Sequence, residues 1–65
     1  MMTELQEALE QGWGVVRISE DRSSGESFDV VTVEKEGASR EFRSDHLAFH
    51  RFVEGLMEDL GLAYS

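Results

Sequence analysis

The chain contains no cysteine and no proline in its 65 residues. Without thiols it has no disulfides, no thiolate metal ligands and no cysteine nucleophile. A domain of this size buries only about 60% of the surface that its unfolded chain exposes, so it commonly depends on a disulfide, a metal or a partner subunit. Because disulfides are excluded, good packing, metal binding by carboxylates or histidines, and self-association remain, and of these we predict self-association as a homodimer.

Long apolar runs and basic residues are also scarce. No segment approaches the roughly 20 apolar residues that span a bilayer, and the start of the chain lacks the basic and apolar regions of a signal peptide. We therefore expect a cytoplasmic protein without membrane contacts. Fourteen acidic and six basic residues give a net charge of −8, which opposes binding to phosphate backbones. Salt adaptation, genome composition and an acidic binding face remain alternative explanations of this charge.

Apolar periodicity predicts a helix at each end of a single domain that spans residues 1–65. In the last third, the apolar residues recur at steps of three and four, which places them on one face of a helix that begins at Ser44-Asp45. A shorter helix is predicted for residues 3–11, because Leu5 and Leu9 share one face and Gly12 follows as a helix terminator.

The segment between the helices has the alternation of β-strands. Strands are predicted for residues 13–20, 28–35 and 38–43, with a mobile loop at residues 20–27 and a tight turn at Glu36-Gly37. The predicted fold is therefore α+β: α-β-β-β-α, with a three-stranded antiparallel sheet packed by the C-terminal amphipathic helix and the short N-terminal helix. We predict that the core contains Leu5, Leu9, Val16, Ile18, Phe28, Val30, Phe42, Phe49, Phe52, Val53, Leu56 and Leu60.

The central strand is apolar on both of its faces, and this pattern leads to a prediction about binding. Phe28 and Val30 are assigned to the core, which leaves Val31 and Val33 on the opposite face. A sheet covered by helices on one side exposes the other, so we expect a partner to cover Val31 and Val33.

Trp13 and three arginines are further interaction candidates. Trp13 lies between two glycines, and it is either an exposed anchor for a partner or a side chain that closes the first helix against the sheet. Arg40, Arg43 and Arg51 either gather into a local basic patch or pair with neighbouring glutamates on the sheet surface.

His46 and His50 are four residues apart and so stand one turn apart on the final helix, a spacing that can hold a metal ion. Imidazole also suits the margin of an apolar stripe without any metal. We therefore predict no metal and no cofactor, and keep these two histidines as the candidate ligands.

Catalytic signatures are sparse. The sequence has no G-x-S-x-G elbow and no glycine-rich phosphate loop, and a chain this short leaves little room for a pocket of about 300 Å³. We predict that the protein is not an enzyme and that it binds an unidentified protein.

The order of elements resembles that of the double-stranded-RNA-binding domain, whose members contact two minor grooves and the phosphates between them. The resemblance covers nearly the whole chain as element order only. The stretch Ser44-Asp45-His46-Leu47-Ala48 stands where that family has a lysine-rich cluster, and Asp21-Arg22-Ser23-Ser24-Gly25 stands where it has a histidine motif. No functional residue is carried over. A nucleic-acid-related role, as an acidic DNA mimic or a weak binder, is the alternative to protein binding.

Overall fold

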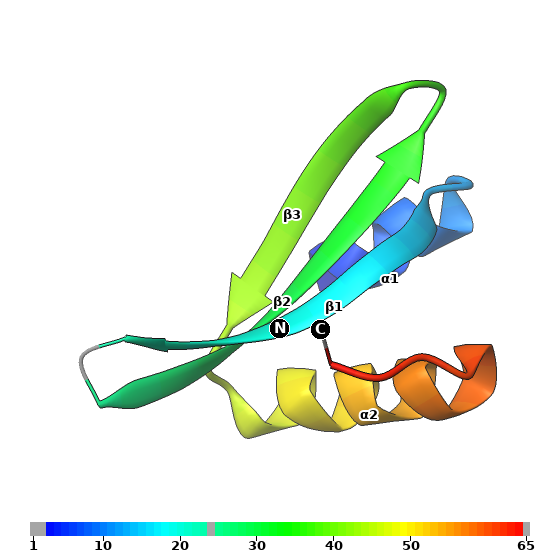
Figure 1. The fold of residues 1–65 in the computed structure, drawn as a ribbon. Coiled ribbons are helices and arrows are strands. Elements are labelled where there is room, and N and C mark those ends of the chain that lie inside the picture. Colours follow the sequence, from blue (N-terminus) through cyan, green and yellow to red (C-terminus); the bar gives the residue numbers. More distant parts are fainter. Residues whose placement is uncertain (1–2, 24, 65) are drawn as a thin grey trace.

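A computed structural model describes residues 3–23 and 25–64, which form two helices and one sheet (Figure 1). The elements are α1 (Thr3–Glu10), β1 (Gly14–Ser23), β2 (Glu26–Lys35), β3 (Ala38–Ser44) and α2 (Leu47–Leu60). The sheet is antiparallel, with strand order β1-β2-β3. The predicted α+β class and α-β-β-β-α order are confirmed.

The two hairpins differ from each other in how well the sequence predicted them. The turn between β2 and β3 consists of Glu36 and Gly37. Their φ angles of 51° and 84° are both positive, as a two-residue type I′ turn requires. The loop predicted at residues 20–27 is wrong, because β1 and β2 stay paired as far as Ser23 and Glu26. Residues 20–23, 26 and 27 thus belong to the strands of a hairpin rather than to a loop.

A β-bulge near the start of β1 changes which residues enter the core. Val15 pairs with Val33, but Arg17 already pairs with Thr32, so Val16 is an extra residue without a partner of its own. The bulge turns Val16 outward, where it is 50% exposed, and brings Ile18 to the face that carries the core. The predicted core position of Val16 is therefore wrong.

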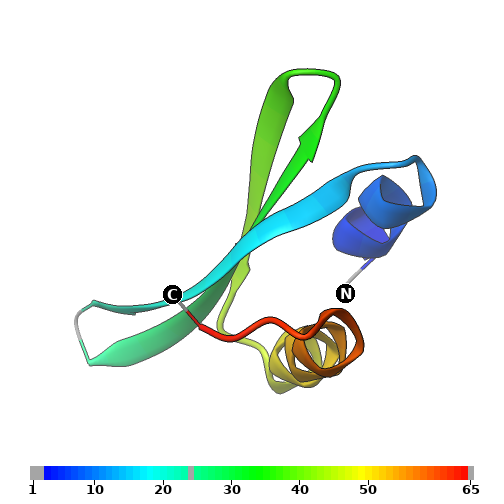
Figure 2. The same ribbon diagram turned by 45° about the vertical axis from the view of Figure 1, so that its right-hand side comes forward.

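The core lies between one face of the sheet, here called the inner face, and the two helices (Figure 2). Val31 and Val33 of β2 have no exposed surface. The prediction that they await a partner is wrong, because the helices cover this face and not the face of Phe28 and Val30. The buried apolar residues are Leu5, Ala8, Ile18, Val30, Val31, Val33, Phe42, Phe49 and Val53.

On the opposite face of the sheet, here called the outer face, the apolar residues of β2 are largely covered by the chain itself. Val30 is only 8% exposed there, and the Arg43 guanidinium lies 4.7 Å from the centre of the half-buried Phe28 ring. Arg43 also forms a 2.8 Å ion pair with Asp21. A hydrogen bond from the Ser23 hydroxyl lowers the pKa of the Asp21 carboxyl, and the hydrogen bond and charge of Arg43 lower it further. The predicted core position of Phe28 is therefore wrong, because its ring packs beneath Arg43 on the outer face.

Helix α2 presents Phe49 and Val53 to the core, while the predicted core residue Leu60 is 53% exposed. Leu9, Phe52 and Leu56 pack against the core as half-buried residues. The helix starts later than predicted: its N-cap is His46, whose backbone N–H donates to the Ser44 hydroxyl at 3.1 Å. No helix among the described residues has the length and apolarity needed to cross a membrane.

Candidate functional site

An open groove lies beside β3, where the starts of both helices approach the sheet. Its volume is about 680 Å³, so the expectation of little room for a pocket is wrong: the elements leave this space between them. The apolar lining consists of Leu5, Phe42, Ala48 and Phe49. The polar lining consists of Glu4, Glu41, Arg43, Ser44 and His46. We call this feature the β3 groove.

The β3 groove adjoins a free edge of the sheet. β3 pairs with β2 on one side, and no strand among the described residues pairs with its other side. Seven consecutive residues of β3 keep a regular register, from Ala38 opposite Lys35 to Ser44 opposite Asp29. A regular edge strand offers a row of unpaired N–H and C=O groups to another chain.

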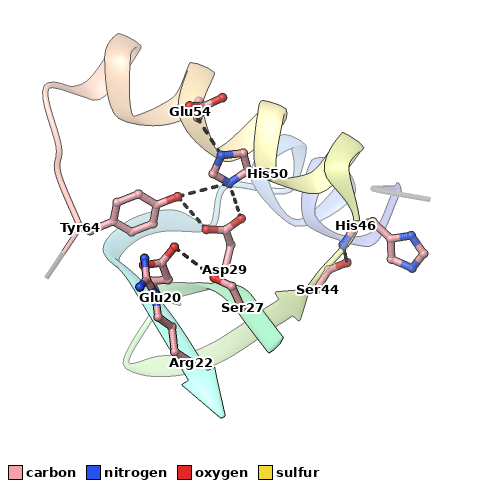
Figure 3. Close-up of polar contacts among 9 residues, drawn as sticks. All are labelled: Glu20, Arg22, Ser27, Asp29, Ser44, His46, His50, Glu54 and Tyr64. Carbon is pink, nitrogen blue, oxygen red and sulfur yellow. Dashed lines mark hydrogen bonds and ion pairs between the residues drawn. The ribbon is translucent and has the colours of Figure 1, made fainter. Parts of the chain in front are cut away.

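A second polar cluster joins β2, α2 and the C-terminal tail on the inner face (Figure 3). Asp29 is 5% exposed and accepts a 2.7 Å hydrogen bond from the Tyr64 hydroxyl. Its other carboxylate oxygen lies 2.8 Å from Nδ1 of His50. Both oxygens of a buried carboxylate therefore have partners, as burial of a charge requires. We call these three residues the Asp29 cluster.

The strand pairing sets a second carboxylate opposite Asp29. Glu20 of β1 is the direct partner of Asp29 in the ladder, and like charges in such positions are destabilising. Glu20 instead binds the Ser27 hydroxyl at 3.1 Å and Nε of Arg22 at 3.1 Å (Figure 3). Each carboxylate is thus stabilised by its own set of donors.

The electrostatics of the Asp29 cluster favour a structural role. The hydrogen bond to Asp29 raises the pKa of His50 above its usual 6.5, and Nε2 of the same ring lies 3.6 Å from Glu54. Acidic partners at both nitrogens favour the imidazolium, which cannot act as a general base. Burial and the Asp29 carboxylate raise the pKa of Tyr64, which keeps its hydroxyl protonated as a donor. The cluster therefore holds the tail against β2.

The structure places Trp13 at the margin of the core. Its half-buried ring packs against the core, and the Arg40 guanidinium lies 5.4 Å from the ring centre. The backbone N–H of Trp13 donates to the carbonyl of Ala8 at 3.0 Å, and Nζ of Lys35 donates to the carbonyl of Gln11 at 2.6 Å. Trp13 thus closes the connection between α1 and β1.

The three candidate arginines do not share one surface. Arg40 pairs with the inner-face residue Val33 and lies 4.8 Å from the Phe42 ring, whereas Arg43 lies over Phe28 on the outer face. Arg51 is an exposed residue of α2. Among the described residues, none of the three forms an ion pair with a neighbouring glutamate of the sheet.

His46 and His50 are not brought together either. His46 is the exposed N-cap of α2 and points away from the sheet, whereas His50 points to Asp29 (Figure 3). Within residues 3–23 and 25–64, no group of three or more metal-binding side chains has a geometry that could hold a metal ion.

Sequence reasoning missed Asp29 and Tyr64. Asp29 had a readable signal, because it is the one charged residue within the apolar run from Phe28 to Val33 and shares the side of Val31 and Val33. Such a residue must find partners when its face is buried. Tyr64 had no comparable signal, since it lies beyond the periodic part of the final helix.

A scan against protein-family models and searches of curated proteins and of solved structures found no match for this chain.

Proposed function

We propose that this chain is a non-enzymatic protein-binding module that receives an extended segment of another polypeptide along the free edge of β3. The observation that carries the proposal is the position of the β3 groove directly beside a regular, unpaired strand. Addition of a strand to a sheet edge is a recurrent mode of peptide recognition, in which the backbone supplies affinity and pockets for alternate side chains supply specificity.

The chemistry of the groove indicates which segments it accepts. Alternate side chains of an added strand point to the inner face, toward the apolar surface of Leu5, Phe42 and Phe49. Glu4 and Glu41 lie in the same lining, and the chain as a whole carries a net charge of −8. We therefore propose that the preferred segment alternates apolar residues with lysine or arginine, since opposite charge favours association.

The test is a selection of random 12-residue peptides on the folded domain, followed by fluorescence anisotropy of the enriched peptides. Ala48 lines the β3 groove and is exposed, so A48W fills the groove without disturbing the core. The control is L47W, because Leu47 is 63% exposed on the same turn and does not line the groove. We expect A48W to weaken binding by at least about tenfold, which corresponds to about 1.4 kcal/mol.

We expect L47W to change the dissociation constant by less than about twofold, which corresponds to about 0.4 kcal/mol. Selected peptides that bind A48W as well as the parent domain would show that the groove is not the site. A selection that enriches no peptide would contradict the proposed function.

A further inference from the structure

We infer that the polypeptide which occupies this edge is a second copy of the same chain, paired β3 to β3 in antiparallel orientation about a two-fold axis at Phe42. The inference rests on the proposed function, because it names the occupant of the same edge. Its product is a continuous six-stranded sheet.

The two edges of the sheet are not equally available. The bulge at Val16 interrupts the ladder at the start of β1, and a bulge is one of the devices that prevent edge-to-edge pairing. Farther along β1, the described C-terminal tail ends beside the strand in both views (Figures 1 and 2). β3 has neither obstacle, and its seven residues form an uninterrupted ladder with β2.

Charged side chains on an edge strand commonly prevent pairing with other chains, and β3 carries charges of both signs. Glu41 is exposed on the outer face and makes no ion pair within residues 3–23 and 25–64. Arg43 lies two residues farther on the same face, and its side chain remains 48% exposed despite the ion pair with Asp21. A guanidinium has five donors, so Arg43 can bind a second carboxylate.

These two residues are self-complementary in one register. A two-fold axis perpendicular to the sheet does not exchange its two faces. The helices of both copies therefore lie on one side, and each residue of β3 pairs with a residue of the same face. With Phe42 opposite the partner's Phe42, Glu41 stands opposite the partner's Arg43, and Arg43 stands opposite the partner's Glu41. Two cross-strand pairs of opposite charge result, an arrangement that stabilises antiparallel strands.

The neighbouring registers place like charges opposite each other. An axis at Glu41 sets that residue against its own copy, and an axis at Arg43 does the same for Arg43. The second of these also sets Glu41 against the partner's Asp45. Like charges directly opposite each other are destabilising, so the register centred on Phe42 is the favourable one of the three.

The same register brings a suitable side chain to the β3 groove. It sets the partner's Arg40 opposite Ser44, which lines the groove together with Glu4. Arg40 belongs to the inner face, as does Phe42. The partner's Arg40 therefore lies on the side of the sheet on which the groove and the Glu4 carboxylate lie, and opposite charge favours association there.

The experiment is sedimentation velocity of the untagged chain over a range of concentrations in 0.15 M salt, where charges are screened over about 8 Å. We expect a monomer–dimer equilibrium. E41R should weaken it at least about tenfold, because two arginines of each copy then face two of the partner. R43E should weaken it similarly through opposed glutamates. Each tenfold change corresponds to about 1.4 kcal/mol.

The decisive sample is the mixture of the two variants. In a heterodimer of E41R with R43E, both cross-strand pairs again join opposite charges, so the mixture should recover the dimer that neither variant forms alone. The matched controls are E58R and R51E on α2, where both residues are exposed outside the β3 groove. These variants make the same changes in net charge and should leave the dimer unaffected. Circular dichroism verifies that R43E folds after loss of its ion pair with Asp21.

Three results would overturn the inference: a monomer at every concentration, a dimer that E41R leaves intact, or a mixture that fails to associate. Failure of the proposed function is distinguishable from these. A monomeric chain whose selected peptides lose affinity in A48W retains the binding function and lacks only the self-pairing. A dimer with the expected charge dependence, together with a selection that enriches no peptide, supports self-pairing and contradicts binding of other polypeptides.

Discussion

Substitution of Val33 and Val16 by alanine is a direct test of the bulge in β1. Both are valines of the same sheet, yet Val33 has no exposed surface and Val16 is 50% exposed. V33A removes two buried methyl groups worth about 0.8 kcal/mol each. A cavity of about 50 Å³ that does not collapse adds about 1.2 kcal/mol at about 24 cal/mol per Å³. We therefore expect V33A to reduce the free energy of unfolding by about 2–3 kcal/mol.

V16A removes the same atoms from a half-exposed position and leaves no cavity, so its expected cost is below about 1 kcal/mol. The assay is urea unfolding at 25 °C, followed by Trp13 fluorescence and circular dichroism with a common slope for all variants. Equal destabilisation by V16A and V33A would refute the reasoning, because it would mean that the strand alternates without a bulge and that Val16 enters the core.

The remaining predictions concern the Asp29 cluster and the turn between β2 and β3. Y64F removes a hydrogen bond to a buried carboxylate from a residue that is 37% exposed, so we expect a loss of about 1 kcal/mol in urea unfolding and faster hydrogen exchange in the tail; unchanged exchange would show that the tail is not held there. Because the folded-state pKa of His50 is raised above its usual 6.5, its stabilising contribution is complete below about pH 6.5 and disappears as the pH rises through the folded value. The urea midpoint of the parent should therefore exceed that of H50Q at pH 6 and approach it by pH 9, whereas a constant difference would contradict the ion pair. E36N places a residue that tolerates positive φ at an angle of 51°, and we expect a gain of about 0.5 kcal/mol, seen as a melting temperature higher by a few degrees; a lower melting temperature would contradict the turn geometry.

The sequence predicted the elements well because their signals are local. Steps of three and four define α2, alternation defines the strands, and Glu36-Gly37 defines a two-residue turn. The ends of elements were harder to predict. Polar residues near Ser23 resemble a loop when read alone, yet cross-strand pairing with Glu26 keeps them in the hairpin.

Local signals in the sequence could not predict which face of the sheet the helices cover. β2 is apolar on both sides, so periodicity does not say whether the helices cover Val31 and Val33 or Phe28 and Val30. The bulge at Val16 has no distinct signature in a run of β-branched residues, and it decides which residues of β1 enter the core. The β3 groove forms where the start of α1 meets β3 and α2 from the other end of the chain, so no single segment of the sequence predicts it.

The bulge at Val16 also limits how far such sheets can grow. A sheet with two regular edges adds copies at both and has no natural end, which is the geometry of fibrils. Here β1 carries an irregularity, whereas β3 is regular. Pairing about a two-fold axis joins the regular edges and leaves a bulged edge at each outer side of the product. In the proposed pairing, a single extra residue in β1 thus makes a closed pair the end point of association and disfavours an open polymer.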